Sequence, residues 1–197
     1  MQVKRGFFPS TFCLSDTCVY VFGGNNGTLD LASSERYDVS ENVWYQIAPM
    51  TLRRNGASCV PFEKHLFVFG GNQQETGSLD SIEKYTLAED RWYTCRVHLK
   101  EPVHDTVPFN LGGNRVIIFG GNSNSQPNTT FDMYDLTCEI LPTTEQYELG
   151  KSYIPPVLDH SSGYLHYYVG YGDSELKHSR MNIGTLLCSC QMRTGFK

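Results

Sequence analysis

The chain has 197 residues, of which 40% are hydrophobic and 13% aromatic, so it can bury a core without a metal or a disulfide. Its formal net charge is −5 and it has no Lys/Arg cluster longer than Arg53-Arg54, which argues against a nucleic-acid partner. Its apolar stretches fall short of the ~20 residues of a transmembrane helix, so we expect no membrane partner.

The cysteines and the N-terminus indicate the cellular setting. The seven cysteines form an odd set without a CxxC pair, and no histidine lies at zinc-ligand spacing from them. Residues 1–9 lack the apolar core and the small-residue cleavage site of a secretory signal. We therefore expect a cytoplasmic protein with free thiols, no bound metal and no cofactor.

Three apolar runs end in a glycine pair at near-constant intervals. The runs are 19–24, 66–71 and 116–121, and their first glycines are 47 and 50 residues apart. A fourth, degenerate run, 167–172, has Tyr171 between its two glycines. A period in this range is typical of solenoids, propellers and arrays. It predicts a single domain over 1–197 with approximate units 1–49, 50–98, 99–148 and 149–197.

An acidic residue followed two positions later by a tyrosine recurs after each of the first three glycine pairs. The tyrosines are Tyr37, Tyr85 and Tyr134, and a tryptophan follows the first two by seven residues, as Trp44 and Trp92. In the third unit Leu141 holds the tryptophan position, so we expect a smaller wedge between the sheets there.

The second unit predicts four short strands, at 57–62, 65–69, 81–86 and 92–98. They are separated by turn signals, and nothing has a helical period, so the fold class is all-β. Glycines at a strand end let a neighbouring ring lie against the backbone. Tyrosine and tryptophan supply that ring, each burying on the order of 150–250 Å². A four-stranded sheet cannot cover such a face alone, so we expect the units to stack face to face.

The unit resembles the kelch repeat, in which each repeat is one blade of a β-propeller. The resemblance is carried by Gly23-Gly24, Gly70-Gly71, Gly120-Gly121, the tyrosines and tryptophans at their spacings, and the linker 48–57. It implies about four four-stranded blades, three clear and one degenerate. Propellers have about four to eight blades, and kelch propellers usually have more than four. An incomplete ring, completed by self-association or by a partner, is therefore favoured over a closed four-bladed ring.

Loops from successive blades converge at one end of a propeller, so the loops that follow the glycine pairs are the expected partner-binding face. Each begins with an asparagine, and the candidate residues are Asn25, Asn26, Asn72, Gln73, Asn122 and Asn124. Their amides could hydrogen-bond a protein partner. Alternatively, the asparagines favour the turn conformation at a strand end.

Arg53 and Arg54 are a second candidate for partner binding. Kelch receptors of ubiquitin ligases resemble this chain in placing an arginine near the start of the outgoing strand, where it binds acidic peptides. The alternative is that the arginine pairs with a carboxylate of a blade.

The resemblance implies a non-enzymatic adaptor or scaffold that binds a protein partner through these loops. A substrate-recognition subunit of a ubiquitin ligase and a cytoskeletal or assembly component are alternatives. Some kelch-like propellers are sugar mutarotases or copper oxidases, so an enzyme is a third. The six histidines form no HxH or HExxH arrangement, and no catalytic residue is predicted.

Overall fold

The computed structural model describes residues 1–6, 12–14, 17–112, 114–123, 126–127, 131–136, 157–159, 161–170 and 176–182. Regular structure in these ranges consists of strands, which confirms the all-β prediction. Within the same ranges, no helix long and apolar enough to cross a membrane is present.

The first two units each form a four-stranded antiparallel sheet. The first contains β1 (Phe12–Leu14), β2 (Cys18–Phe22), β3 (Ser34–Asp38) and β4 (Val43–Ile47), in that spatial order. The second contains β5 (Ser58–Phe62), β6 (His65–Phe69), β9 (Ser81–Thr86) and β10 (Arg91–His98), with β5 and β10 at its edges. Strands β6 and β9 have the bounds predicted from the sequence, and β5 and β10 differ from the prediction by one residue at their starts.

The third and fourth units each form a sheet with three described strands. The third sheet consists of β11 (Val107–Gly112), β12 (Arg115–Phe119) and β15 (Phe131–Asp135). The fourth consists of β16 (Val157–Asp159), β17 (Tyr164–Gly170) and β18 (Leu176–Asn182). The degenerate fourth unit therefore forms a sheet despite the tyrosine between its glycines.

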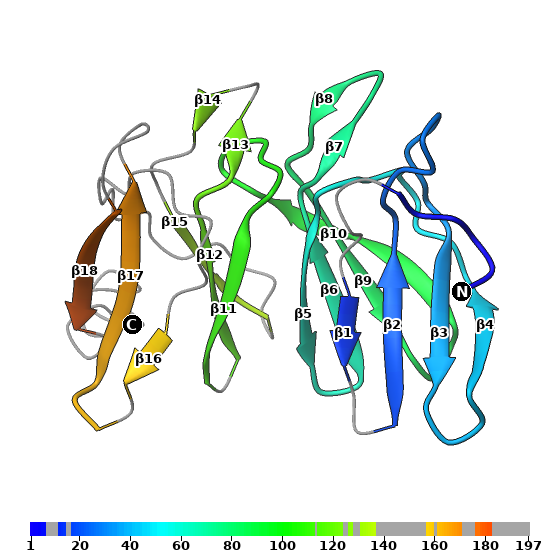
Figure 1. Ribbon diagram of the computed structural model, residues 1–197, viewed down its shortest axis with the longest axis horizontal. Helices are drawn as coiled ribbons and strands as arrows, with labels where there is room; N and C mark the ends of the chain where they lie inside the picture. Colours follow the sequence, from blue (N-terminus) through cyan, green and yellow to red (C-terminus); the bar gives the residue numbers. More distant parts are fainter. Residues whose placement is uncertain are drawn as a thin grey trace.

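The segments after the second and third glycine pairs form small hairpins. One pairs β7 (Asn72–Gln73) with β8 (Gly77–Ser78), and the other pairs β13 (Asn122–Ser123) with β14 (Gln126–Pro127). Both project from the same end of the molecule (Figure 1).

The four sheets follow one another in chain order across the molecule, from the first at the right to the fourth at the left (Figure 1). The strands at the start of neighbouring units meet, because β1 contacts β5 and β5 contacts β11. The first and fourth sheets lie at opposite ends of this row (Figure 1).

A tryptophan fills the interface between the first two sheets. The Trp92 ring meets the Phe22 ring edge-on, with centroids 5.0 Å apart and an interplanar angle of 89°. The Trp92 indole N–H donates to the Ala48 carbonyl at 2.8 Å. Tyr85 and Met50 lie in the same buried cluster. The two sheets are therefore joined by aromatic packing and a directed hydrogen bond.

The interface between the second and third sheets contains a small apolar cavity of about 20 Å³. Phe69 and Tyr134 are among the residues that line it, and they are the counterparts of Phe22 and Tyr85 in the preceding interface. Leu141, predicted to replace the tryptophan wedge here, lies outside the described residues. A cavity of this size holds about one water molecule and is too small for an organic ligand.

Tyr85 makes the stability of this packing sensitive to alkaline pH. Burial, followed by the hydrogen bond from its hydroxyl to Asp90, raises the pKa of Tyr85 above its ordinary value of 10.0. The unfolded chain therefore loses this proton first. We expect the free energy of unfolding to fall by about 1 kcal/mol per pH unit from this group once the pH exceeds about 10.

Urea denaturation at pH 8 and pH 11 measures this effect. In Tyr85→Phe the loss of stability between the two pH values should be smaller than in the wild type, because the titrating group is gone. Leu87→Ala, an exposed position in the turn after β9, removes no titrating group, so it is the control and should keep the wild-type loss. An equal alkaline loss in all three proteins would contradict the prediction.

Candidate functional site

The candidate site is the end of the sheets from which the hairpins project, here called the loop face and consisting of residues 25–30, 53, 72–78 and 122–123. Backbone pairing holds its loops against the linkers between units. Asn55 and Asn72 exchange N–H···O bonds of 2.9 and 2.7 Å, and His104 and Asn122 exchange bonds of 2.9 and 2.8 Å. Each loop is therefore anchored by main-chain bonds as it leaves its glycine pair.

A buried carboxylate joins the first loop to the second. Asp30 is 3% exposed, and its Oδ1 accepts from the side-chain amides of Asn25 at 2.8 Å and Asn55 at 2.6 Å. Its Oδ2 accepts from the backbone N–H of Gln74 at 2.6 Å. These three hydrogen bonds offset the cost of removing the Asp30 carboxylate from water. Asp30 therefore fixes two loops from different units as one surface.

Asn25 and Asn26 shape the first loop with their side chains. Asn25 Oδ1 accepts from the backbone N–H of Gly27 at 2.7 Å, and Asn26 Oδ1 accepts from those of Thr28 and Leu29 at 2.9 Å. These bonds are the side-chain turns that asparagine favours. The structure thus supports the turn interpretation for both residues.

The other predicted amides have different surroundings. Asn72 and Asn122 are half-buried at the starts of β7 and β13. The Asn122 side chain hydrogen-bonds Asp105, whose pKa is raised by burial against the opposing effect of His104. Gln73 is half-buried and faces a surface pocket. Asn124 lies outside the described residues.

A shallow pocket separates the first and second loops. It is lined by Leu29, Asp30, Arg53, Gln73, Gln74 and Glu75. Leu29 is 45% exposed and Arg53 is also exposed, so the pocket offers an apolar side chain and a guanidinium to solvent. Among the residues predicted from the sequence, the pocket brings together Arg53 and Gln73.

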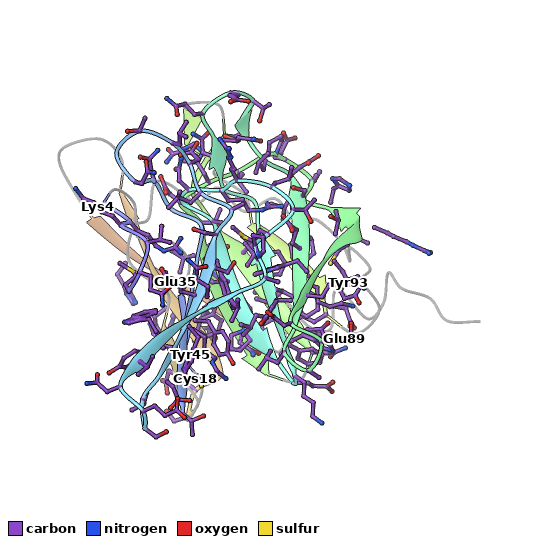
Figure 2. All side chains as sticks on the ribbon, turned by 90° about the vertical axis from the view of Figure 1, so that its right-hand side faces the viewer. Lys4, Cys18, Glu35, Tyr45, Glu89 and Tyr93 are labelled. Atoms are coloured by element: carbon purple, nitrogen blue, oxygen red, sulfur yellow. The ribbon has the colours of Figure 1, made fainter. Side chains whose placement is uncertain are left out.

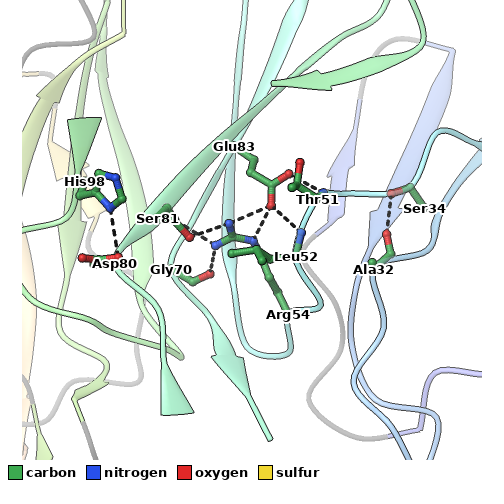
Figure 3. Close-up of polar contacts among 10 residues, drawn as sticks. All are labelled: Ala32, Ser34, Thr51, Leu52, Arg54, Gly70, Asp80, Ser81, Glu83 and His98. Atoms are coloured by element: carbon green, nitrogen blue, oxygen red, sulfur yellow. Dashed lines mark hydrogen bonds and ion pairs between the residues drawn. The ribbon is translucent and has the colours of Figure 1, made fainter. Parts of the chain in front are cut away.

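Arg54, in contrast, is fully buried, and its guanidinium lies among Glu83, Ser81 and Gly70 (Figure 3). Its Nε and Nη2 donate to Glu83 Oε1 at 3.1 and 2.9 Å. Nη1 donates to the carbonyls of Gly70 and Ser81, and Nη2 also donates to the Ser81 hydroxyl, at 2.6 to 2.9 Å. All five N–H donors of the guanidinium therefore have an acceptor inside the protein.

The partner-binding prediction for Arg54 is therefore wrong, and the alternative of an ion pair within the repeat is correct. Desolvation by burial lowers the pKa of Arg54, and the Glu83 carboxylate opposes that effect. Thr51 and Leu52 donate their backbone N–H groups to the same carboxylate at 2.7 and 3.2 Å. The pair thus ties the linker to the second sheet.

The first unit repeats this arrangement with Arg5 and Glu35. Arg5 Nη2 lies 3.1 Å from Glu35 Oε2, and its Nη1 donates to the carbonyls of Gly23 and Ser33. The two side chains are 2% and 0% exposed. In the third unit the arginine position, 49 residues after Arg54, is occupied by Val103, which is also buried.

Comparison with known proteins identifies the repeat. The family model described as the KLHDC2/KLHL20/DRC7 Kelch-repeats domain matches residues 9–186. The chain belongs to the kelch-repeat family. Its sheets are therefore blades of a kelch β-propeller, as the sequence resemblance implied.

Three curated kelch relatives illustrate the similarity. Kelch-like protein 35 of Mus musculus is 34% identical over 74 residues, covering 38% of this chain and 13% of the relative. Kelch-like protein 25 of Xenopus tropicalis is 26% identical over 133 residues, covering 63% and 22%. Spermatocyte protein spe-26 of Caenorhabditis elegans is 25% identical over 158 residues, covering 77% and 27%. The chain thus spans about a quarter or less of the length of each.

Sequence reasoning missed several residues of this kelch chain. Asp30 and Leu29 belong to no motif, and their roles arise only when two blades meet. Arg5 could have been found, because it lies 49 residues before Arg54 and each is followed 29 or 30 residues later by a glutamate of the Glu-x-Tyr element. Among the described residues, no three His, Cys, Asp or Glu side chains are grouped so that they could hold a metal.

Proposed function

We propose that this kelch chain is a non-enzymatic interaction module that binds a protein partner through the loop face. The observation that carries the proposal is the Asp30 carboxylate, which locks the loops of the first and second blades together around a solvent-facing pocket. Loops that are ordered before binding lose less conformational entropy when a partner docks.

Leu29 and Arg53 are the proposed anchors. Leu29 offers an exposed apolar side chain beside the pocket, and Arg53 offers an exposed guanidinium on the same rim. Arginine is enriched among residues that dominate binding energy, and it prefers carboxylate acceptors. The expected partner segment therefore carries an acidic side chain next to an apolar one.

A variant with Leu29→Ala, Arg53→Ala and Gln73→Ala tests the proposal. The tagged wild type and the variant are each used to capture proteins from a native lysate, and the captured proteins are quantified by mass spectrometry. Partners that use the loop face should be depleted at least about tenfold by the variant, since two anchors together contribute more than about 1.4 kcal/mol.

The matched control carries Val39→Ala, Lys64→Ala and Leu87→Ala, three exposed positions in turns at the opposite end of the sheets. It should capture the same proteins as the wild type. Equal capture by the loop-face variant and the wild type would remove the loop face as the binding site.

A further inference from the structure

The chain contains two Asn-Gly dipeptides, Asn26-Gly27 on the loop face and Asn55-Gly56 in the linker beside it. Asparagine is a thermolabile residue, because the backbone nitrogen that follows it can attack the carbon of its side-chain amide. A following glycine favours this attack, since it has no side chain to shield the nitrogen and its backbone is permissive. The folded chain gives the two dipeptides very different surroundings.

The first dipeptide lies in an open part of the first loop. Gly27, Thr28 and Leu29 are exposed, and Asn26 is half-buried. A Cβ added at Gly27, where φ is 100°, would meet no heavy atom of the described residues within 4 Å, its chain neighbours apart. The loop stands at the upper end of the molecule, whereas the labelled Cys18 lies near the lower end (Figure 2). Water therefore reaches the Gly27 peptide.

The Asn26 side chain is held by two backbone groups. Its Oδ1 accepts from the N–H groups of Thr28 and Leu29, both at 2.9 Å. These bonds close a ring around the Gly27 peptide, so they hold Asn26 Cγ beside the Gly27 nitrogen. The N–H of Gly27 donates to Asn25 Oδ1 at 2.7 Å. That bond lies in the peptide plane and does not occupy the face from which the nitrogen attacks.

The same two donors favour the attack electrostatically. When a nucleophile adds to Asn26 Cγ, negative charge develops on Oδ1. Donors at about 2.7–3.1 Å from such an oxygen stabilise the tetrahedral intermediate of acyl transfer. The N–H groups of Thr28 and Leu29 already lie at this distance in the folded loop.

The second dipeptide is held in the opposite way. Asn55 Nδ2, the atom that would have to leave, donates to the buried Asp30 carboxylate at 2.6 Å. The backbone of Asn55 exchanges two hydrogen bonds with Asn72, and the Gly56 carbonyl accepts from the Asp105 N–H at 2.7 Å. A Cβ at Gly56 would lie 2.3 Å from Asp105 Oδ1. The Gly56 peptide is therefore fixed and crowded, which opposes ring closure.

We propose that Asn26 is a site of spontaneous deamidation in the folded protein and that Asn55 is protected from it. The Gly27 nitrogen bonds to Asn26 Cγ and gives its proton to water. The Cγ–Nδ2 bond breaks as Nδ2 takes up a proton and leaves as ammonia. Water then opens the resulting succinimide at either of its two carbonyl carbons. Asparagine and water thus give ammonia and either aspartate or isoaspartate, with no change in oxidation state.

The consequence for partner binding rests on the proposed function. Either product places a new carboxylate on the loop face. Isoaspartate also lengthens the main chain by one carbon before Gly27, so it displaces Leu29, a proposed anchor. An acidic partner segment would be repelled by the added charge. Binding through the loop face should therefore weaken as the protein ages.

Peptide mass spectrometry of the purified chain, incubated at pH 8, measures the conversion at each asparagine. In the folded chain Asn26 should convert at least about tenfold faster than Asn55, because only Asn26 has donors on its amide oxygen and an open glycine. In guanidinium chloride both dipeptides are exposed, so their rates should be similar. Asn26 should convert at least as fast in the folded chain as in the unfolded chain.

A pair of variants tests the role of the donors on Asn26 Oδ1. Thr28→Pro removes one of these N–H groups, and Thr28→Ala keeps it. Thr28→Pro should slow the conversion of Asn26 in the folded chain by at least about threefold, less than a donor contributes in a buried active site, because water can replace it here. Thr28→Ala should convert at the wild-type rate. In guanidinium chloride the three proteins should convert alike.

The proposal is overturned if folded Asn26 converts no faster than Asn55, or if it converts more slowly than in the unfolded chain. These rates involve no partner, so they can establish the site even if the loop-face variant captures the same proteins as the wild type. If the loop face does bind partners, aged wild-type protein should capture them in proportion to its unconverted fraction. Full capture by converted protein would contradict the expected consequence for binding.

Discussion

Replacing Arg54 with alanine should lower the free energy of unfolding by about 3–5 kcal/mol. The substitution leaves the Glu83 carboxylate, which is 0% exposed, without its cationic partner. It also removes the donors to the carbonyls of Gly70 and Ser81. Since a domain is stable by only about 5–15 kcal/mol, the variant should be close to unfolding at room temperature.

Urea denaturation followed by far-UV circular dichroism measures the change. Arg53→Ala is the matched control, because this neighbouring arginine is exposed, and its effect should stay within about 0.5 kcal/mol. A loss below about 1 kcal/mol for Arg54→Ala would mean that the buried ion pair does not form, since exposed pairs contribute about that much or less.

The strands of the second blade could be predicted because their signals are local. An apolar run that ends in two glycines fixes β6, and the alternation around Tyr85 fixes β9. The glycine pairs are also a local signal in the sequence, but glycine is required there because of contacts with residues that are distant in the chain. A Cβ at Gly23, where φ is 60°, would lie 2.2 Å from the Arg54 carbonyl oxygen.

The role of the acidic residue before each tyrosine could not be predicted in this way. Its recurrence was visible, yet Glu83 acts on a guanidinium 29 residues earlier in the chain. Nothing in a window around Glu83 indicates that partner. The same limit explains why Arg54 was assigned to the surface: its burial depends on the linker lying between two blades.

The sequence predicts that the loops after the glycine pairs gather at one end of the sheets, but it does not predict how these loops are joined to one another. The asparagines that begin the loops were the visible signal, and two of them mainly shape the first loop. Asp30, which joins two loops, accepts from residues 25 and 44 positions away in the chain. Single-residue features of this kind become evident only when neighbouring blades are packed together.

Trp92→Ala should also lower the free energy of unfolding by about 3–5 kcal/mol, because it leaves a cavity between two blades and removes the hydrogen bond to Ala48. Trp44→Ala removes the same side chain from the matching position of the first blade. That position is partly exposed, so the expected loss in dilute protein is smaller, about 1 kcal/mol. Thermal or urea denaturation of both variants checks the difference. Equal losses for the two tryptophans in dilute protein would show that the two blades are buried alike.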